Sequence, residues 1–172
     1  MRILNIFKTL LISSVFLSTS TFAQNVFVPL PIDEWSYTVS YNFFTIHHIS
    51  DDYEDDVTGK HIDWNENNKM IGVRVSVNEN IGYYIGHGKN SYYEDSTMAG
   101  VEFSTNNPTW EIGSDIGIAT GYEQAIKIGI MPIINPFIRY NLNLTNRLTT
   151  SVKVGSMNLM AENAFVELKF KF

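Results

Sequence analysis

Apolar and polar residues alternate one by one through most of this chain, and that pattern restricts the fold more than any other feature. Between Val166 and Phe172 every second residue is apolar, and the residues between them are Glu or Lys. The same alternation runs from Trp35 to Phe43 and from Ile71 to Val77. Successive side chains of a β-strand point to opposite faces, so a period of two is the spacing of a strand. The pattern therefore predicts an all-β protein.

Eight segments carry this alternation, separated by turn signals. They are 34–48, 67–77, 80–90, 96–105, 109–121, 126–142, 147–156 and 164–172. Two antiparallel architectures accept such segments: a sandwich with its apolar faces inside, and a membrane barrel with its apolar face toward lipid. The alternation by itself does not decide between them.

Connection lengths and aromatic positions favour the barrel. Short connections at "VNEN", "TNNPT" and "LTNR" contrast with longer ones at 49–66, 90–95, 121–126 and 157–163. This asymmetry, aromatic residues near the segment ends, and an alternating last segment that ends in Phe172 are typical of outer-membrane barrels. We expect an eight-stranded antiparallel transmembrane β-barrel of the bacterial outer membrane, with its short turns toward the periplasm.

The first 23 residues are typical of a secretory signal peptide. Arg2 and Lys8 supply positive charge, residues 10–16 form a short apolar core, and small residues precede Gln24. We therefore expect a signal peptide over 1–23 and a single barrel domain over 24–172. Such a barrel would be inserted by the outer-membrane barrel assembly machinery, and we expect it to remain a monomer.

Charge and composition exclude several classes of function. The formal net charge is -6 at pH 7, whereas nucleic-acid binding needs clusters of Lys and Arg to replace counterions. The chain contains no cysteine, so it has neither disulfides nor a thiolate metal site. No cofactor or metal motif is recognisable. The acidic loop at 51–68 is either a solvated surface or a divalent-cation site that bridges lipopolysaccharide phosphates.

Charged residues alternate with the apolar face and therefore point into the predicted lumen. They are Arg74, Glu102, Glu111, Asp115, Arg139, Lys153 and Glu167. An eight-stranded barrel has room inside only for side chains or one slender ligand. Because a buried unpaired charge costs several kcal/mol, we predict that these three cations and four anions pair into a rigid plug.

One motif lies after the third predicted strand and points to a specific chemistry. "KNSY", residues 89–92, is similar to the Lys-Asp-Ser-aromatic motif of the outer-membrane lipid A palmitoyltransferase family, with Asn90 in place of the aspartate. "MAGVEF", residues 98–103, resembles that family's next strand, and Gly100 lies within it. "TIHH", residues 45–48, matches the end of its first strand and places His47 on the family's essential histidine.

Further motifs follow in the same order along residues 45–172. "WNENN" at 64–68 resembles the segment before the family's second strand, and "PIINP" resembles its Pro-x-x-x-Pro through Pro132 and Pro136. The resemblance implies transfer of an acyl chain from a phospholipid to lipid A, with membrane lipids as partners and no cofactor. Serine and asparagine are also common turn residues, so an ordinary loop is the alternative interpretation of the motif.

The resemblance implies roles for individual residues. His47 would act as the base and Ser91 as nucleophile or hydrogen-bond donor, beside Asn90. Lys89 would hold a lipid phosphate. Tyr92, Gly100, Glu102, Pro132 and Pro136 would contact the lipid.

Three departures from the family change these expectations. Asn90 cannot ionise, and Glu102 stands where the family has an inward glycine at the floor of its acyl pocket, which predicts a chain shorter than palmitate. Asn42 and Asn68 replace prolines that open the seam between the first two strands. The competing function is a non-enzymatic barrel with a structural, surface-masking or adhesive role.

Overall fold

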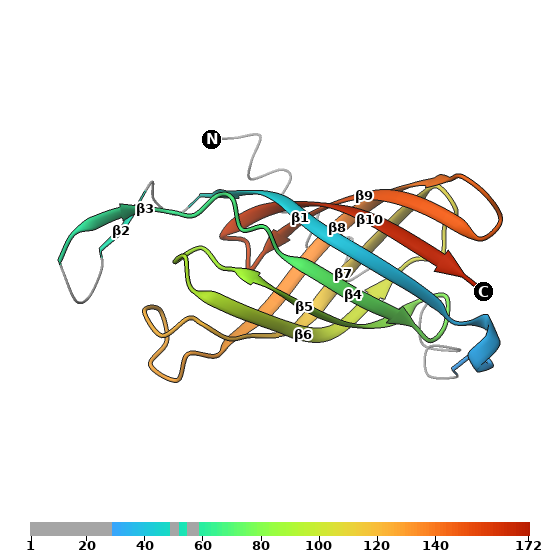
Figure 1. Ribbon diagram of the computed structural model, residues 1–172, viewed down its shortest axis with the longest axis horizontal. Coiled ribbons are helices and arrows are strands. Elements are labelled where there is room, and N and C mark those ends of the chain that lie inside the picture. Colours follow the sequence, from blue (N-terminus) through green and yellow to red (C-terminus); the bar gives the residue numbers. More distant parts are fainter. Residues whose placement is uncertain (1–28, 49–51, 55–58) are drawn as a thin grey trace.

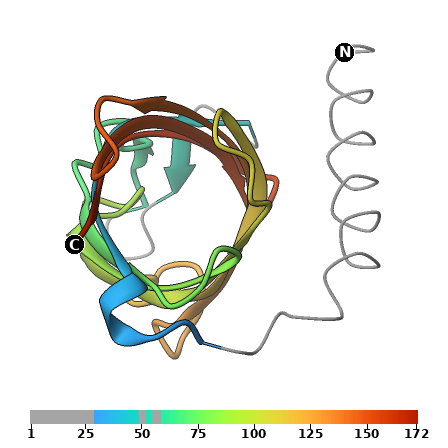
Figure 2. The same ribbon diagram turned by 90° about the vertical axis from the view of Figure 1, so that its right-hand side faces the viewer.

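The computed structural model describes residues 29–48, 52–54 and 59–172 as an antiparallel barrel that closes on itself (Figures 1 and 2). Its strands are β1 (Ser36–His47), β4 (Ile71–Ser76), β5 (Ile81–Lys89), β6 (Asp95–Ser104), β7 (Trp110–Ala119), β8 (Met131–Asn143), β9 (Leu148–Met157) and β10 (Ala161–Lys171). All eight predicted segments form strands, which confirms the fold class. The predicted signal peptide lies outside the described residues.

The first and last strands of the barrel complete the ring. β1 pairs with β10 from Ser36↔Lys171 to His47↔Ala161, with a bulge between Asn42 and Phe44. β1 also pairs with β4 on its other side, from Ser36↔Ser76 to Tyr41↔Ile71. Every strand of the barrel therefore has a partner strand on each side.

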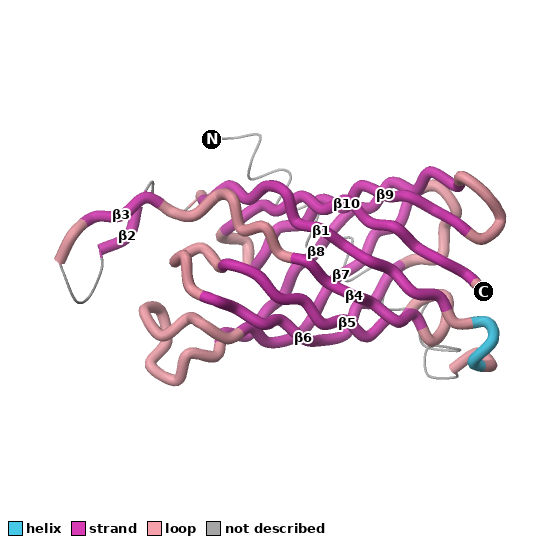
Figure 3. Tube along the Cα trace, in the orientation of Figure 1, coloured by secondary structure: helices cyan, strands magenta, loops and turns pink. Residues whose placement is uncertain are grey.

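Two differences from the predicted segments have local causes. The sixth strand begins at Met131 and not near 126, because residues 122–129 fold into turns in which Ile126 N–H donates to the Tyr122 carbonyl and Gly129 takes a φ of +67°. The first long loop contains a hairpin of β2 (Asp52–Glu54) and β3 (His61–Asp63), visible apart from the barrel in Figure 3. Its strands are too short to produce a recognisable alternation.

The two ends of the barrel differ. One end, the loop end, carries the β2–β3 hairpin and the connections at 90–94, 120–130 and 158–160. The other, the turn end, carries the short connections at 77–80, 105–109 and 144–147, together with the start of β1 and the end of β10. A 3₁₀ turn, η1 (Ile32–Glu34), precedes β1 at this end. In Figure 1 the loop end lies on the left.

Large apolar side chains cover the outside of the barrel. Ile85 and Ile134 are 57% and 58% exposed although they lie within strands, and Ile71, at the start of β4, is 57% exposed. A water-soluble barrel buries such residues, whereas a barrel in a bilayer presents them to lipid. The exterior is therefore that of a transmembrane barrel. Among the described residues, no helix is long and apolar enough to cross a membrane.

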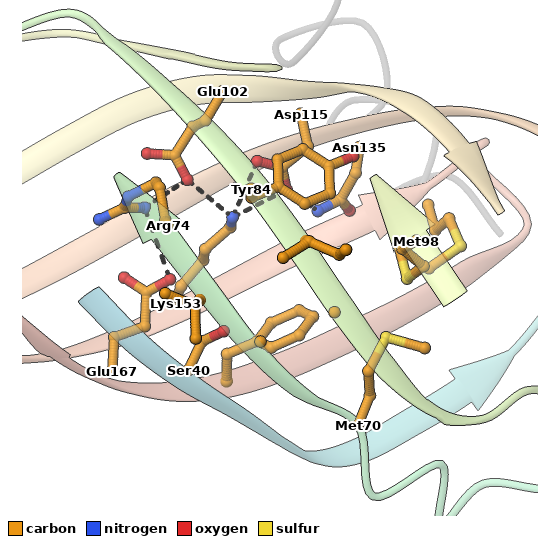
Figure 4. A pocket seen from close by; sticks show the side chains of 16 residues that line it. Ser40, Met70, Arg74, Tyr84, Met98, Glu102, Asp115, Asn135, Lys153 and Glu167 are labelled. Atoms are coloured by element: carbon orange, nitrogen blue, oxygen red, sulfur yellow. Dashed lines mark hydrogen bonds and ion pairs between the residues drawn. The ribbon is translucent and has the colours of Figure 1, made fainter. Parts of the chain in front are cut away.

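Charged residues fill the middle of the lumen, as predicted (Figure 4). Glu102 accepts hydrogen bonds from Arg74, Arg139 and Lys153 at 2.5, 2.6 and 3.0 Å. Arg139 also pairs with Glu167 at 2.7 Å, and Lys153 with Asp115 at 2.8 Å. All of these side chains are buried. The network closes the lumen and ties β4, β6, β7, β8, β9 and β10 together.

An apolar cluster lies between this network and the loop end. Its buried members are Met70, Met98, Ala119, Tyr122 and Ile133, and Tyr84, Tyr92, Met131 and Met157 pack against it. The lumen is thus divided into a charged layer below and an apolar layer above. In Figure 4, Met70 and Met98 lie on the opposite side of the pocket from Arg74 and Glu102.

Candidate functional site

The imidazole of His47 and the hydroxyl of Ser91 meet at the loop end. His47 is the last residue of β1, and Ser91 follows the end of β5, yet His47 Nε2 lies 2.7 Å from Ser91 Oγ. This is the distance at which a histidine base and a serine nucleophile act together. Both residues come at or just after the loop-end termini of their strands, and the closed barrel brings them together at one rim.

The pair lies beyond the apolar band of the barrel. Ile46, next to His47, pairs across the strands with Glu162, and Glu162 bonds His48 at 3.1 Å. A carboxylate facing outward at this level marks the rim where the lipid-facing surface ends. His47 and Ser91 are therefore positioned at the boundary between lipid and water.

Aromatic stacking holds the His47 ring in place. The indole of Trp64 lies parallel to the imidazole, with ring centroids 4.8 Å apart and 15° between the planes. Within the described part of the chain, the buried Nδ1 of His47 has no hydrogen-bond partner. Burial, and secondarily the neighbouring His48, lower the pKa of His47 below its usual value. The ring is thus neutral at pH 7 and able to accept a proton.

Asn90 shapes the loop and does not orient the histidine. Its side-chain carbonyl accepts the backbone N–H groups of Tyr92 at 2.9 Å and Glu94 at 3.0 Å, and its amide donates to the Gly121 carbonyl. Asn65 fixes the same loop, because its side chain donates to the Asn90 carbonyl at 2.9 Å. A catalytic role for Asn90 remains a prediction, while the contacts here are those of a turn residue.

Four aromatic side chains form a cluster beside the pair, called the roof here: Tyr53, Trp64, Tyr92 and Tyr122. Trp64 packs against Tyr53 of β2 and against Tyr92, with ring centroids 5.0 Å away in both cases. Tyr92 in turn contacts Tyr122 at 5.9 Å, and Tyr122 belongs to the apolar cluster of the lumen. Burial raises the pKa of Tyr122 to about 12, so it stays protonated. The roof joins the β2–β3 hairpin to the lumen.

One cavity borders His47, and a second lies deeper in the lumen. The first, the rim pocket, has a volume of about 720 Å³ and opens at the loop end; its lining residues are His47, Asp63, Trp64, Asn65, Glu66, Asn67, Lys69, Lys89 and Tyr93. The second is a space of about 50 Å³ inside the lumen, between the methionines of the apolar cluster and the charged network. The rim pocket is large enough for a polar group, and the inner space holds only a short apolar segment.

The other predicted lipid-contacting residues lie at different levels of the barrel. Lys89 lines the rim pocket and bonds Asp95 at 3.0 Å, whereas Tyr92 lies in the roof. Gly100 faces the lumen, where a Cβ would lie 2.7 Å from Tyr84 Oη, so the absence of a side chain makes room for the tyrosine. Glu102 belongs to the charged network under the apolar cluster.

Pro132 and Pro136 interrupt the ladder of β8. The pairing of β8 with β9 begins only at Phe137↔Gly155, which leaves Met131 to Pro136 outside that ladder. Asn158 bridges the interruption, since its amide donates to the Pro132 carbonyl at 3.0 Å and its side-chain oxygen accepts the Ile134 N–H at 2.8 Å. Proline removes a strand donor, which explains the break.

At the seam between β1 and β4, Asn42 supplies a backbone donor. The backbone N–H of Asn42 donates to the Met70 carbonyl at 2.8 Å. A proline at this position would lack the donor. The wall between β1 and β4 is therefore hydrogen-bonded at Asn42.

No sequence pattern predicts a role for Trp64, Tyr53 or Lys69. Trp64 begins the "WNENN" motif, but a contact between its indole and His47 depends on the path of the loop after β3. The one sequence feature that could have indicated this contact is an isolated tryptophan in the acidic loop that follows His47.

Comparisons with known proteins yield similar structures. No protein family profile matches the sequence. No curated protein sequence matches it either. A designed protein described as "De novo design of transmembrane beta-barrels" shares 13% identity over 84% of this chain and 100% of its own, with a TM-score of 0.49.

Two further solved structures are similar to the chain. The solution NMR structure of the designed TMB2.3 shares 14% identity over 81% of this chain and 94% of its own, with a TM-score of 0.49. Ail, the attachment invasion locus protein of Yersinia pestis, crystallised with the heparin analogue sucrose octasulfate, shares 11% identity over 79% of this chain and 94% of its own, with a TM-score of 0.31. At these identities the likenesses concern the fold.

Proposed function

We propose that this protein is an outer-membrane acyltransferase that moves an acyl chain from a phospholipid to lipid A at the loop end of the barrel. The observation that carries the proposal is the 2.7 Å contact between His47 Nε2 and Ser91 Oγ at the membrane rim. A histidine and a serine in hydrogen-bond contact are the parts that acyl transfer through a covalent intermediate requires.

The proposed reaction has two steps. In the first, His47 takes the proton of Ser91 Oγ while that oxygen attacks the ester carbonyl of the phospholipid. The lysophospholipid leaves as an alcohol with the proton from His47, and the acyl chain stays on Ser91. In the second, His47 takes a proton from a lipid A hydroxyl, which attacks the acyl-serine and restores Ser91.

The apolar layer of the lumen offers a place for the end of the acyl chain. Met70, Met98 and Met157 border the inner space, and methionine side chains adapt readily to an apolar ligand. Glu102 and its cations lie directly below this layer. A hydrocarbon chain cannot displace a paired carboxylate at low cost, so the accepted chain is shorter than palmitate.

The resemblance of "TIHH", "KNSY" and "MAGVEF" to the lipid A palmitoyltransferase family also supports the proposal. In the outer membrane, the short turns of the barrel would face the periplasm. The rim pocket at the other end would then face the outer leaflet, where lipid A resides. A folded barrel of this kind requires the outer-membrane assembly machinery and the signal peptide predicted over 1–23.

Mass spectrometry of lipid A tests the proposal. Cells that express the intact protein should contain lipid A with one added acyl chain, and cells that express Ser91→Ala should not. Ser156→Ala is the matched control, because Ser156 also lies near the loop end but on β9, separated from β1 by β10. Unchanged lipid A in cells whose barrel is correctly inserted would refute the proposal.

A non-enzymatic barrel is the second candidate, and one observation favours it. The buried Nδ1 of His47 has no hydrogen-bond partner among the described residues, so the usual acidic member of a serine triad is missing. In this case the β2–β3 hairpin would mediate adhesion or mask the surface. Normal lipid A together with reduced surface attachment after deletion of residues 52–63 would support this function.

A further inference from the structure

The rim pocket contains charges of both signs next to Ser91. Asp63 and Glu66 supply two carboxylates, and Lys69 and Lys89 supply two ammonium groups. All four side chains belong to exposed residues, and His47 forms part of the same wall. The pocket is therefore close to neutral overall and carries charges of both signs.

Most of these charges have no ion-pair partner within the protein. Among the described residues, Lys89 pairs with Asp95 at 3.0 Å, outside the pocket lining, while Asp63, Glu66 and Lys69 form no salt bridge. Exposed ion pairs contribute little to stability, so such side chains can exchange a partner in the protein for a ligand at small cost. The charges around this open space of about 720 Å³ are therefore available to a ligand with both signs.

Backbone strain occurs on two walls of the pocket. Lys69 and Tyr93 have φ values of +37° and +62°, in the region that non-glycine residues rarely adopt. Lys69 is held there by its buried neighbours Asn68 and Met70. The loop before it is anchored to β1, because Thr45 N–H donates to the Glu66 carbonyl at 3.0 Å. Strain that the surrounding structure maintains is concentrated at binding sites.

We infer that the rim pocket binds the head group of a zwitterionic phospholipid, a phosphate diester joined to a short alkylammonium. Lys69 and Lys89 contact the phosphate, and Asp63 and Glu66 contact the ammonium. This inference deepens the proposed function, on which it rests, by naming the class of acyl donor. A head group bound here places the adjoining glycerol esters toward Ser91, because His47 lies in the pocket wall.

Binding to the inactive Ser91→Ala protein in detergent tests the inference without chemistry. Trp64 lines the pocket, so its fluorescence reports binding when Trp35 and Trp110 are replaced by Phe. Short-chain phosphatidylethanolamine and phosphatidylglycerol, each below its critical micelle concentration, are the probes. Charge-assisted hydrogen bonds from the ammonium group to the two carboxylates should strengthen binding. We therefore expect phosphatidylethanolamine to bind about tenfold more tightly than phosphatidylglycerol. Equal affinities would overturn the inference.

Two variants and a control assign the preference to the pocket. Glu66→Lys should abolish or reverse the preference for phosphatidylethanolamine, and Lys69→Gln should weaken the binding of both lipids. Lys127→Gln, in the exposed connection at 120–130, should change neither affinity. A preference that survives Glu66→Lys would refute the assignment to this pocket.

Two further experiments distinguish a lipid from a soluble ligand, and a failure of this inference from a failure of the proposed function. Glycerophosphoethanolamine without acyl chains should bind much more weakly than the lipid; equal binding would identify a soluble phosphoamine as the ligand and overturn the lipid assignment. Selective binding by Ser91→Ala without acyl transfer by the intact protein would refute the proposed function alone. Acyl transfer from both lipids at equal rates would refute the head-group inference alone.

Discussion

The indole of Trp64 lies flat against the imidazole of His47, with 4.8 Å between the ring centroids and 15° between the planes. In serine hydrolases an acidic residue orients the histidine through Nδ1. Here Nδ1 is buried without a partner among the described residues, so the stacked ring is the contact that fixes the imidazole plane.

Replacement of Trp64 should therefore affect turnover. We expect Trp64→Ala to lower kcat by about tenfold or more, since a misplaced base forfeits much of the advantage of proximity. Trp64→Phe keeps a stacking ring and should retain most of the activity. Steady-state kinetics on both variants, with lipid binding measured separately, distinguish a positioning role from a general loss of structure. Equal kcat values for Trp64→Ala and Trp64→Phe would contradict a positioning role for the stacked ring.

The pH dependence of transfer should follow His47. The group acts as a base, so it is active when neutral, above its pKa in the folded protein. Burial lowers that pKa below the usual value of 6.5, so activity should persist to a more acidic pH than an exposed histidine allows. The measurement is kcat/KM between pH 4 and 8, expressed as a rising curve. A midpoint above the usual histidine value would contradict the environment described here.

The loop role of Asn90 makes a restored aspartate unfavourable. In Asn90→Asp the amide that donates to the Gly121 carbonyl is replaced by a second oxygen, and two acceptors then face each other. We expect Asn90→Asp to lower activity and to increase protease cleavage of the connection at 90–94. Higher activity in this variant would show that a carboxylate at position 90 acts on His47 and would contradict the loop role of Asn90.

Glu102 should be important for stability, because it is the common partner of three buried cations. Glu102→Gln removes the charge and leaves these cations short of one anion. The loss of a buried partner typically costs about 3–5 kcal/mol. Urea unfolding in detergent, followed by the shift of the barrel on unheated gels, measures the change. Glu34→Gln, at an exposed residue before β1, is the control and should have no effect.

The same position should influence the length of the transferred chain. If Glu102→Gly still inserts as a barrel, the space below Met98 and Met157 becomes deeper, and the added acyl chain should be longer. The mass of the modified lipid A gives the chain length directly. An identical length in the variant and the intact protein would refute a pocket floor at Glu102.

The sequence predicted the strands and the direction of the side chains well, because both depend on local alternation. Arg74, Asp115 and Lys153 were assigned to the lumen from their spacing alone, and all three are buried there. The β2–β3 hairpin was not predicted, since three-residue strands such as Asp52–Glu54 do not establish a period.

The candidate site was predictable only in part. Strand ends placed His47 and Ser91 on one rim, but their contact depends on the barrel closing at the correct register. The stacking of Trp64 depends on how the connection after β3 folds back, and no pattern in the sequence encodes this path. The hydrogen bonds of Asn90 to Tyr92 and Glu94 are local, and turn chemistry could have indicated them.

The pairing of β1 with β10 has a consequence for how the protein is made. β1 cannot complete its pairing until β10 has been synthesised, because this partner strand lies more than a hundred residues later in the chain. A chain that stops before residue 161 would leave β1 and β9 each with a row of unpaired backbone groups, in a solvent that offers no hydrogen bonds. Stable insertion therefore requires the whole barrel sequence. A truncated chain would not form a stable barrel in the membrane and would be open to degradation.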